Sequence, residues 1–412
     1  MDESGACVIV GGGQAGGRAA ETLREAGFEG PIVIVAGERH RPYERPPLSK
    51  QVLTGDAEAE IAFLRPPDFY EKKGIELRLD AWVTGIDRAG GRVLLQDGAT
   101  LAYSRLLLAT GARPRHIDLP GARLPGVHLL RDMDQSLALR KVLQNGGRLV
   151  VVGGGYIGLE VAASARKCGC AVTVLEAADG LMRRQVAPEL GDWYADLHRR
   201  HGVEIKLRTS VAGFEGKARV DAVFDSDGCH YPADAVVVGV GVLPNVELAQ
   251  QAGLKVDNGI VVDSTGRSSD PAIFAAGDVT NHPNGILGRR LRLESWQNAQ
   301  NQAIAAARTM AGQEREYTQV PWFWTDQYDV NLQMVGLPEQ WDRLVWRGKS
   351  EEQEPFTLFY LDSAGRVVSA NAVNNGGDIA PARKLIETGV RPDPIALSDP
   401  DVSLKKVIKN AV

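Results

Sequence analysis

The chain has 412 residues, of which 44% are hydrophobic and 24% charged, and its formal net charge at pH 7 is −5. This length allows two to three domains with ample core, and an acidic chain without a long basic block is not expected to have nucleic acid as its main partner. No apolar stretch is long enough to span a bilayer, and Met1 is followed almost at once by the first apolar run, so we expect a cytoplasmic protein without a membrane partner.

The first predicted element is a buried parallel strand over residues 6–10, because its hydrophobic run is continuous and does not alternate. A turn with the spacing G-x-G-x-x-G follows it and begins a helix; it contains Gly11, Gly13, Ala15 and Gly16. Glycines let the backbone turn sharply and approach a pyrophosphate, whose charge then lies on free N–H groups at the positive end of the helix. This segment therefore predicts a bound dinucleotide.

The next strand, residues 32–35, is followed by Ala36 and Gly37 before the first acid, Glu38. A carboxylate near this strand end can accept a hydrogen bond from a ribose 2′-OH. Glu38 is thus a candidate ribose ligand of the first dinucleotide, and a solvated loop carboxylate is the alternative.

The same arrangement recurs later in the chain. A strand over residues 149–152 leads into a second turn with Gly153, Gly155 and Gly158. The strand after it, residues 171–175, ends in Glu176, where a carboxylate accepts from a ribose 2′-OH and repels a 2′-phosphate. We therefore expect two dinucleotides in one protein, hence electron transfer, and a preference for NADH over NADPH.

Two further buried strands end in short polar motifs. Residues 106–109 precede Thr110 and Gly111, and residues 272–276 precede Gly277 and Asp278. In this order around a second dinucleotide motif, they resemble the two-dinucleotide flavoprotein superfamily that includes glutathione reductase. The resemblance implies an α/β fold with two Rossmann-like domains, FAD at the first glycine loop, and a hydrogen bond that the Asp278 carboxylate accepts from the FAD ribityl chain.

Three segments narrow the resemblance to one branch. Residues 41–50, 293–299 and 321–328 resemble FAD-dependent ferredoxin reductases of the putidaredoxin reductase and biphenyl dioxygenase ferredoxin reductase type. This branch implies an NADH:ferredoxin oxidoreductase, in which FAD takes a hydride from NADH and passes single electrons to a 2Fe-2S ferredoxin serving a haem monooxygenase or a Rieske dioxygenase. Rubredoxin reductases and redox-gated binding proteins of the apoptosis-inducing-factor type share much of the pattern and remain alternatives.

The resemblance also implies site residues. For FAD they are Ala15, Arg45, Lys50, Val83, Thr110, Gly111, Arg131, Asp278 and Trp296. For NAD they are Gly155, Tyr156, Ile157, Glu160, Glu176, Arg184 and Gly241. Relatives often carry an acid where this chain has Gly37, which leaves the FAD ribose contact to Glu38 or to the backbone.

Three side chains are candidates for a direct part in hydride transfer. The resemblance implies that Lys50 lies near N5 of the flavin and pairs with Glu160, and such an ion pair would keep both charges tolerable in a partly dry site. Trp324 is expected to cover the nicotinamide side. The alternatives are that Lys50 is a surface lysine, that Glu160 is an acid favoured by the start of a helix, and that Trp324 is a core tryptophan.

The four cysteines do not suggest a thiol relay or a metal site. Cys7 lies inside the first strand, Cys229 lies in a turn-like segment, and Cys168 continues an apolar helix face. The pair formed by Cys168 and Cys170 is too close for ordinary zinc spacing and has no second pair. We therefore expect no metal and a flavin that passes its electrons directly.

Chain order predicts a discontinuous FAD domain over residues 1–113 and 243–320, an NAD domain over 114–242, and a C-terminal α+β domain over 321–412. In the C-terminal domain, stretches of alternating hydrophobicity at 356–360 and 367–370 predict an antiparallel sheet, and a helix is predicted to follow at 380–388.

An acidic ferredoxin would need a locally basic docking face. Three clusters are candidates, each with an ordinary solvated face as its alternative: Arg289, Arg290 and Arg292; Arg343, Arg347 and Lys349; Lys405, Lys406 and Lys409.

Overall fold

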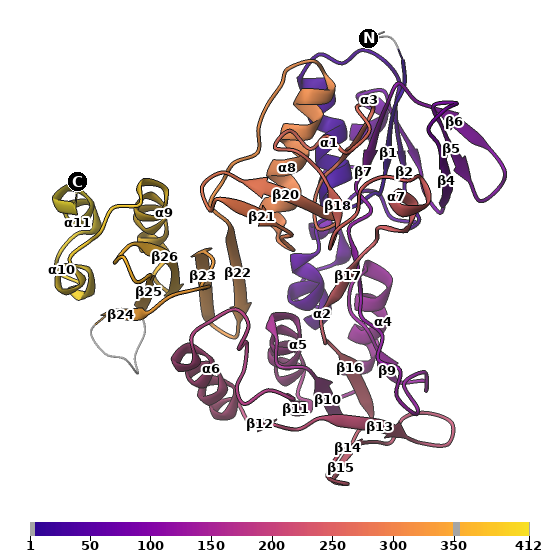
Figure 1. Cartoon of the computed structure of the whole chain (residues 1–412). Coiled ribbons are helices and arrows are strands. Elements are labelled where there is room, and N and C mark those ends of the chain that lie inside the picture. Colours follow the sequence, from indigo (N-terminus) through magenta and orange to yellow (C-terminus); the bar gives the residue numbers. More distant parts are fainter. Residues whose placement is uncertain (1–4, 349–354, 412) are drawn as a thin grey trace. The chain divides into compact units, whose positions relative to one another are not determined.

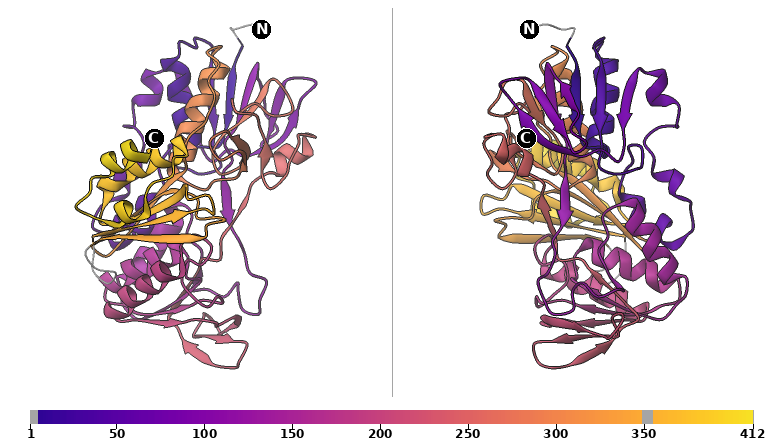
Figure 2. Two further views of the ribbon diagram at one scale, coloured as in Figure 1. Left: turned by 60° about the vertical axis from the view of Figure 1, so that its left-hand side comes forward. Right: turned by 90° about the vertical axis from the view of Figure 1, so that its right-hand side faces the viewer.

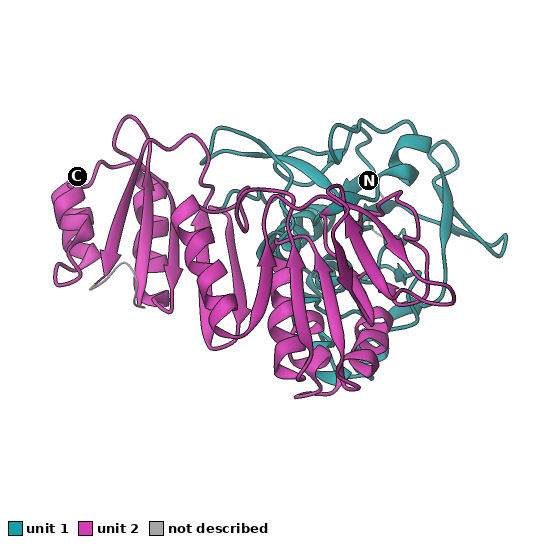
Figure 3. Ribbon diagram, turned by 90° about the horizontal axis from the view of Figure 1, so that it is seen from below, with its two compact units in different colours: residues 1–46, 59–113, 242–319 teal, residues 47–58, 114–241, 320–412 magenta. Residues whose placement is uncertain are grey.

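The computed structural model describes residues 5–348 and 355–411, which form two compact units (Figure 3). Unit 1 consists of the residues up to Pro46 with Ala59–Arg113 and Val242–Gln319, and unit 2 consists of Pro47–Glu58, Pro114–Gly241 and the residues from Val320 onward. The first glycine loop therefore lies in unit 1 and the second in unit 2.

A five-stranded parallel sheet forms the centre of unit 1, in the order β19-β7-β1-β2-β3 (Figure 1). Its strands are β1 (Cys7–Val10), β2 (Ile32–Val35), β3 (Ile75–Arg78), β7 (Arg105–Leu108) and β19 (Ile273–Ala275). β1 and β2 are buried along their whole length, which explains their continuous hydrophobic runs.

Helices α1 (Gln14–Glu25) and α8 (Trp296–Met310) pack against each other in unit 1, and both views of Figure 2 show them side by side. The contact is made by small residues, including Ala19, Ala303 and Ala306, which are fully buried. Small side chains let the two helix backbones approach closely.

Smaller elements complete unit 1. Two three-stranded sheets are formed by β4 (Val83–Asp87), β5 (Arg92–Leu95) and β6 (Thr100–Ala102), and by β18 (Ile260–Val261), β20 (Thr280–Asn284) and β21 (Arg289–Leu291). The short helices are α3 (Phe69–Lys72), α7 (Glu247–Gln251) and the 3₁₀ helix η2 (Ala59–Ala62). β8 (Ala112–Pro114) and β17 (Val242–Pro244) pair where the chain leaves unit 1 and returns to it.

Unit 2 contains a second parallel sheet, in the order β12-β11-β10-β16-β9. Its strands are β9 (Val127–His128), β10 (Arg148–Val152), β11 (Ala171–Leu175), β12 (Val203–Lys206) and β16 (Ala235–Val238). The helices with it are α2 (Gln51–Thr54), α4 (Met133–Leu143), α5 (Tyr156–Lys167) and α6 (Pro188–Arg200), preceded by the 3₁₀ helix η1 (Pro46–Ser49). An antiparallel sheet is formed by β13 (Val211–Glu215), β14 (Ala222–Asp225) and β15 (His230–Pro232).

The C-terminal part of unit 2 is an antiparallel sheet in the order β22-β23-β26-β25-β24. Its strands are β22 (Trp322–Gln327), β23 (Val330–Gly336), β24 (Arg343–Gly348), β25 (Phe356–Leu361) and β26 (Val367–Val373). The helices with it are η3 (Gly376–Asp378), α9 (Ile379–Thr388), α10 (Pro394–Ser398) and α11 (Leu404–Ala411). The predicted fold class is therefore confirmed: two Rossmann-like parts and a C-terminal α+β part.

One hydrophobic core runs through unit 2 from the parallel sheet into the C-terminal sheet, with Leu159 of α5 and Tyr360 of β25 both fully buried in it. The compact units divide the chain differently from the three predicted domains at two points. Residues 47–58 lie in unit 2, and residues from 320 onward share a unit with residues 114–241. The predicted domain limits themselves stay a prediction.

Two buried histidines make the stability of the protein sensitive to acid. Burial lowers the pKa of His198 and of His282 from 6.5 to about 4. As the pH falls from 6.5 to 4, the unfolded chain therefore takes up protons on these rings while the folded chain does not, so each ring lowers the free energy of unfolding, by up to about 3 kcal/mol.

We expect urea titrations to show a free energy of unfolding that is level above pH 7 and falls steeply between pH 6.5 and 4. His198→Gln should reduce this pH dependence of the free energy of unfolding by the contribution of about one proton. His116→Gln, at an exposed position, should leave the pH dependence unchanged. An equal slope in the wild-type protein and in both variants would contradict the assignment.

Candidate functional site

The first glycine loop has the shape that a dinucleotide requires. Gly11 has a φ of +120°, and a Cβ there would lie 2.2 Å from the carbonyl oxygen of Ala109. A Cβ at Gly16 would lie 1.9 Å from the carbonyl oxygen of Gly11. Neither position can hold a larger residue without moving the backbone, so the loop stays close to the sheet.

The start of α1 is open to an anion. Its N-cap is Gly13, no described side chain caps it, and the first turn carries no acidic residue. The first N–H groups of the helix are therefore available for a phosphate, whose charge the helix dipole also favours. Ala15 lies in this first turn, and Val83, another predicted FAD contact, is the buried first residue of β4.

The second glycine loop repeats this geometry in unit 2. Gly153 has a φ of +106°, and a Cβ at Gly158 would lie 2.1 Å from the carbonyl oxygen of Gly153. The N-cap of α5 is Gly155, again without a described side-chain cap. Both loops thus fit the pyrophosphate of a dinucleotide by the same criteria.

Glu176 lies at the second loop, as predicted. Its Oε2 accepts a hydrogen bond from the backbone N–H of Gly154 at 2.6 Å, and its Oε1 accepts from that of Ala178 at 2.7 Å. Each carboxylate oxygen has a second lone pair, so the group can still accept from a ribose hydroxyl. The structure therefore places a fixed negative charge beside the loop.

Glu38 is an ion-paired carboxylate whose side chain is 37% exposed, and its contact with a ribose stays a prediction. It accepts from the hydroxyl of Tyr43 and from Nη2 of Arg45 at 2.9 Å. Burial raises the pKa of Glu38, but the charge of Arg45 and these hydrogen bonds outweigh it, so the pKa lies below its usual value. The negative charges of Glu38 and Asp278 both act on Arg45, and the structure thus brings these three predicted residues into one electrostatic cluster.

The remaining predicted residues of unit 1 lie at strand and helix ends. The Thr110 hydroxyl donates to the carbonyl of Asn245 at 2.8 Å, and the Asn245 amide donates back to the carbonyl of Thr110 at 2.8 Å. Gly111, with a φ of +62°, follows directly. Trp296 is the first residue of α8, and its indole N–H donates to Glu44 at 2.7 Å.

Lys50 and Glu160 form a shielded ion pair in unit 2. Nζ of Lys50 lies 2.9 Å from Oε1 of Glu160, and the exposed fractions of the two side chains are 13% and 3%. The hydroxyl of Thr325 donates to the same Oε1 at 2.7 Å, and the hydroxyl of Ser49 donates to Oε2. The buried carboxylate therefore accepts from three donors, and Lys50 is not an ordinary exposed surface lysine. The roles of both residues at a flavin stay a prediction.

Sequence reasoning missed Ser49 and Thr325. The signal for Thr325 was the alternation of β22, since successive side chains of a strand point to opposite faces. Trp322 and Trp324 share one face and stack with ring centroids 5.0 Å apart, and the Trp324 indole donates to Asp326 at 3.1 Å. Thr325 therefore lies on the opposite face.

Unit 2 also contains four further predicted NAD residues and the predicted FAD residue Arg131, which differ in burial and contacts. Tyr156 packs on Phe323, with ring centroids 4.8 Å apart, and its hydroxyl donates to the sulfur of Met334, so its side chain belongs to the core beside the C-terminal sheet. Ile157 and Arg184 are exposed, Gly241 has a φ of +97°, and Arg131 lies just before α4.

The cysteines do not offer a redox pair. All four are free thiols. Burial raises the pKa of Cys7 to about 12, so this thiol is an inert core group. Cys168 is only partly buried, packed at the edge of the unit 2 core, and Cys229 is exposed. In the described part of the chain, no cluster of three or more His, Cys, Asp or Glu side chains could hold a metal ion.

One predicted docking cluster is wrong at its central residue. The side chain of Arg347 is 7% exposed and pairs with Asp378 at 3.1 Å, and its guanidinium also donates to the carbonyls of Leu397 and Val402. Arg347 anchors the C-terminal helices and cannot meet a partner. Lys349 lies outside the described residues.

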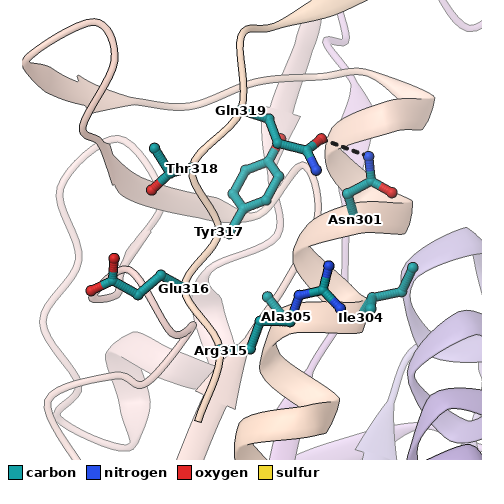
Figure 4. Close-up of a pocket in the computed structure, with 8 residues that line it drawn as sticks. All are labelled: Asn301, Ile304, Ala305, Arg315, Glu316, Tyr317, Thr318 and Gln319. Carbon is teal, nitrogen blue, oxygen red and sulfur yellow. Dashed lines mark hydrogen bonds between the residues drawn. The ribbon is translucent and has the colours of Figure 1, made fainter.

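A small polar hollow of about 180 Å³ in unit 1 lies between α8 and residues 315–319 (Figure 4). Its lining includes Asn301 and Gln319, which are joined by a 2.7 Å hydrogen bond, and it includes none of the predicted site residues.

None of the helices in the described ranges combines the length and the apolar character needed to cross a bilayer.

Comparison with known proteins identifies the family. Residues 5–303 match the model of the pyridine nucleotide-disulphide oxidoreductases, and residues 322–408 match that of the reductase C-terminal domain. The chain is 47% identical over 398 residues to the ferredoxin–NAD(+) reductase component of the anthranilate 1,2-dioxygenase system of Burkholderia cepacia, covering 97% of this chain and 98% of that protein.

It is also 41% identical over 417 residues to putidaredoxin reductase of Pseudomonas putida, covering 100% of this chain and 98% of that protein. A solved structure of the covalent putidaredoxin reductase–putidaredoxin complex matches with a TM-score of 0.95 and 41% identity over 99% of both chains. The chain therefore belongs to the pyridine nucleotide-disulphide oxidoreductase family and, within it, to the FAD- and NAD-dependent group of the ferredoxin–NAD(+) reductases and putidaredoxin reductase.

Proposed function

We propose that this protein is an NADH:ferredoxin oxidoreductase that delivers electrons to a 2Fe-2S ferredoxin serving a haem monooxygenase or a Rieske dioxygenase. The observation that carries the proposal is the combination of two glycine loops with a buried Lys50–Glu160 ion pair, in a chain whose four cysteines are all free thiols. A disulfide reductase would need a reactive thiol pair instead.

The proposed FAD residues of unit 1 are Gly11, Gly13, Ala15, Gly16, Glu38, Arg45, Val83, Thr110, Gly111, Asp278 and Trp296, and those of unit 2 are Lys50 and Arg131. The proposed NAD residues are those of the second loop and its neighbours: Gly153, Gly155, Tyr156, Ile157, Gly158, Glu160, Glu176, Arg184 and Gly241. Tyr156 would contribute through its backbone, because its side chain is engaged in the core.

Bound FAD supplies the redox chemistry, since it accepts two electrons as a hydride and releases them one at a time. The chain's own residues bind, orient and shield. Lys50 presents a positive charge whose position is fixed by the ion pair with Glu160. Trp324, stacked on Trp322, is proposed to cover the nicotinamide side and exclude water. Positioning thus contributes more to the rate than acid–base chemistry.

We place the protein in the cytoplasm, where NADH is regenerated by metabolism. Its four free thiols fit a reducing compartment.

The function is tested by NADH-dependent reduction of cytochrome c with and without an added 2Fe-2S ferredoxin. We expect the ferredoxin to stimulate turnover strongly, because the haem protein is reduced through it. Equal or greater stimulation by a rubredoxin would favour a rubredoxin reductase. A long-lived NAD complex with negligible turnover would contradict the proposal and favour a redox-gated binding protein.

Docking to an acidic ferredoxin gives a separate prediction. Arg289 is exposed on β21, whereas the guanidinium of neighbouring Arg290 donates to Asn281 and to the carbonyl of Val262. We expect Arg289→Glu to slow ferredoxin reduction severalfold at low salt, with the loss shrinking as salt is added. NADH-to-ferricyanide turnover should not change.

The control is Lys141→Glu, the same reversal of sign at an exposed site on α4. Equal losses in the ferredoxin and ferricyanide assays, or an equal loss in the control, would refute a docking role for Arg289.

A further inference from the structure

A chain of buried hydrogen bonds extends from Oε1 of Glu160, whereas Ser49 contacts its Oε2. Strand β22 carries Thr325 and Gln327 two residues apart, so both lie on one face of the strand. Thr325 binds Glu160 of α5, and Gln327 binds His198 of α6. The elements β22, α5 and α6 all belong to unit 2 and are labelled in Figure 1. The four side chains have exposed fractions of 3% or less.

The distances in this chain are all those of hydrogen bonds. The hydroxyl of Thr325 lies 2.7 Å from Oε1 of Glu160, and Nε2 of Gln327 lies 3.2 Å from that hydroxyl. Oε1 of Gln327 lies 2.8 Å from Nε2 of His198. The hydroxyl of Tyr328 lies 3.0 Å from Nδ1 of the same ring.

The charge of Glu160 determines the direction of every bond. An ionised carboxylate only accepts, so Thr325 must donate its single proton to Glu160. Its oxygen can then only accept, and the Gln327 amide must present N–H to it and its carbonyl to His198. The ring must therefore carry its proton on Nε2, which leaves Nδ1 to accept from Tyr328.

This direction assigns a role to the chain. An amide does not readily pass a proton, so Gln327 makes the chain a poor proton path, while every bond in it contributes to fixing a side-chain orientation. We propose that Thr325, Gln327 and His198 are positioning residues that hold the Glu160 carboxylate in the orientation that pairs with Lys50. The inference rests on the proposed function, because the pair matters for catalysis only if Lys50 lies at the flavin.

The first test separates the hydroxyl of Thr325 from its shape. Thr325→Val removes the donor and keeps the volume, whereas the control Thr325→Ser keeps the donor. We expect the valine variant, and likewise Gln327→Leu, to reduce the rate at which NADH reduces bound FAD about tenfold, as fits the loss of an ordered hydrogen bond to a charged group. The dissociation constant for NADH should change less than twofold, and the serine variant should keep most of the wild-type rate.

The second test does not depend on activity. ¹H–¹⁵N NMR of histidine-labelled holoprotein should show His198 as the neutral Nε2–H tautomer, assigned by the loss of its signals in His198→Asn, and Gln327→Leu should abolish that preference. An Nδ1–H tautomer in the wild-type protein would overturn the inference, as would a serine variant as slow as the valine variant. A wild-type protein that does not oxidise NADH would instead overturn the proposed function, whereas an active wild type with unaffected Thr325→Val would overturn this inference alone.

Discussion

Replacing Glu176 by Arg is expected to reverse the nucleotide preference of the protein, with kcat/KM for NADH falling about a hundredfold and that for NADPH rising about tenfold. The carboxylate lies at the second glycine loop, where it accepts from the backbone of Gly154 at 2.6 Å. The substitution removes a charged acceptor for the ribose 2′-OH, worth about 2–3 kcal/mol, and introduces a fork that can pair with a 2′-phosphate.

Steady-state kinetics with both nucleotides, using ferricyanide as the electron acceptor, measures the change. The matched control is Glu204→Arg, which makes the same charge change at an exposed position on the neighbouring strand β12. We expect the control to keep the wild-type preference. If Glu176→Arg also leaves the ratio of the two kcat/KM values unaltered, the carboxylate does not select the nucleotide.

The second large effect is expected from breaking the Lys50–Glu160 pair. Glu160→Ala leaves a shielded ammonium without its counter-charge, because the Lys50 side chain is only 13% exposed. Removing one partner of a buried pair costs about 3–5 kcal/mol of stability. The rate of FAD reduction by NADH should also fall, about a hundredfold, since Lys50 loses the group that fixes its position.

The double variant Lys50→Met/Glu160→Leu distinguishes stability from catalysis. With both charges gone, no unpaired ion stays buried, so the free energy of unfolding should recover most of its loss. The rate of FAD reduction should remain low, because the positive charge is absent. Urea unfolding and rapid-mixing absorbance at the flavin band measure the two quantities. A double variant that recovers its rate together with its stability would show that the pair serves the fold alone.

Much of this protein could be predicted because its signals are local. The strands at 32–35 and 171–175 were predicted with the bounds that the structure has, since buried parallel strands are continuous hydrophobic runs. Both glycine loops depend on backbone conformations within a few residues, and Gly11 and Gly153 have the positive φ that such turns need.

The basic clusters show where a linear sequence misleads. Arg343, Arg347 and Lys349 are close in the chain, and Arg343 and Arg347 lie on one face of β24, but Arg343 is exposed at the start of the strand whereas Arg347 is buried. The Arg347 guanidinium binds Asp378 and the carbonyls of Leu397 and Val402, and is a structural anchor. The charge pattern of a sequence does not distinguish a solvated arginine from one that binds backbone carbonyls, because the partners of the arginine come from residues distant in the chain.

The two nucleotide loops, the α/β class and Glu176, which directly follows β11, could be inferred from the sequence alone, because each depends on a short stretch of backbone or on hydrophobic periodicity. The partners of Glu160 other than Lys50 could be known only from the tertiary structure. Ser49 comes from η1, Thr325 and Gln327 come from β22, and His198 comes from α6. Nothing in the local sequence of these three elements indicates that Ser49 and Thr325 bind Glu160, or that Gln327 binds His198, each across more than 100 residues of chain. The physical reason is that a buried carboxylate must satisfy its lone pairs with whichever donors the packed core brings within 3 Å or so, and that is a property of packing, which distant segments determine together.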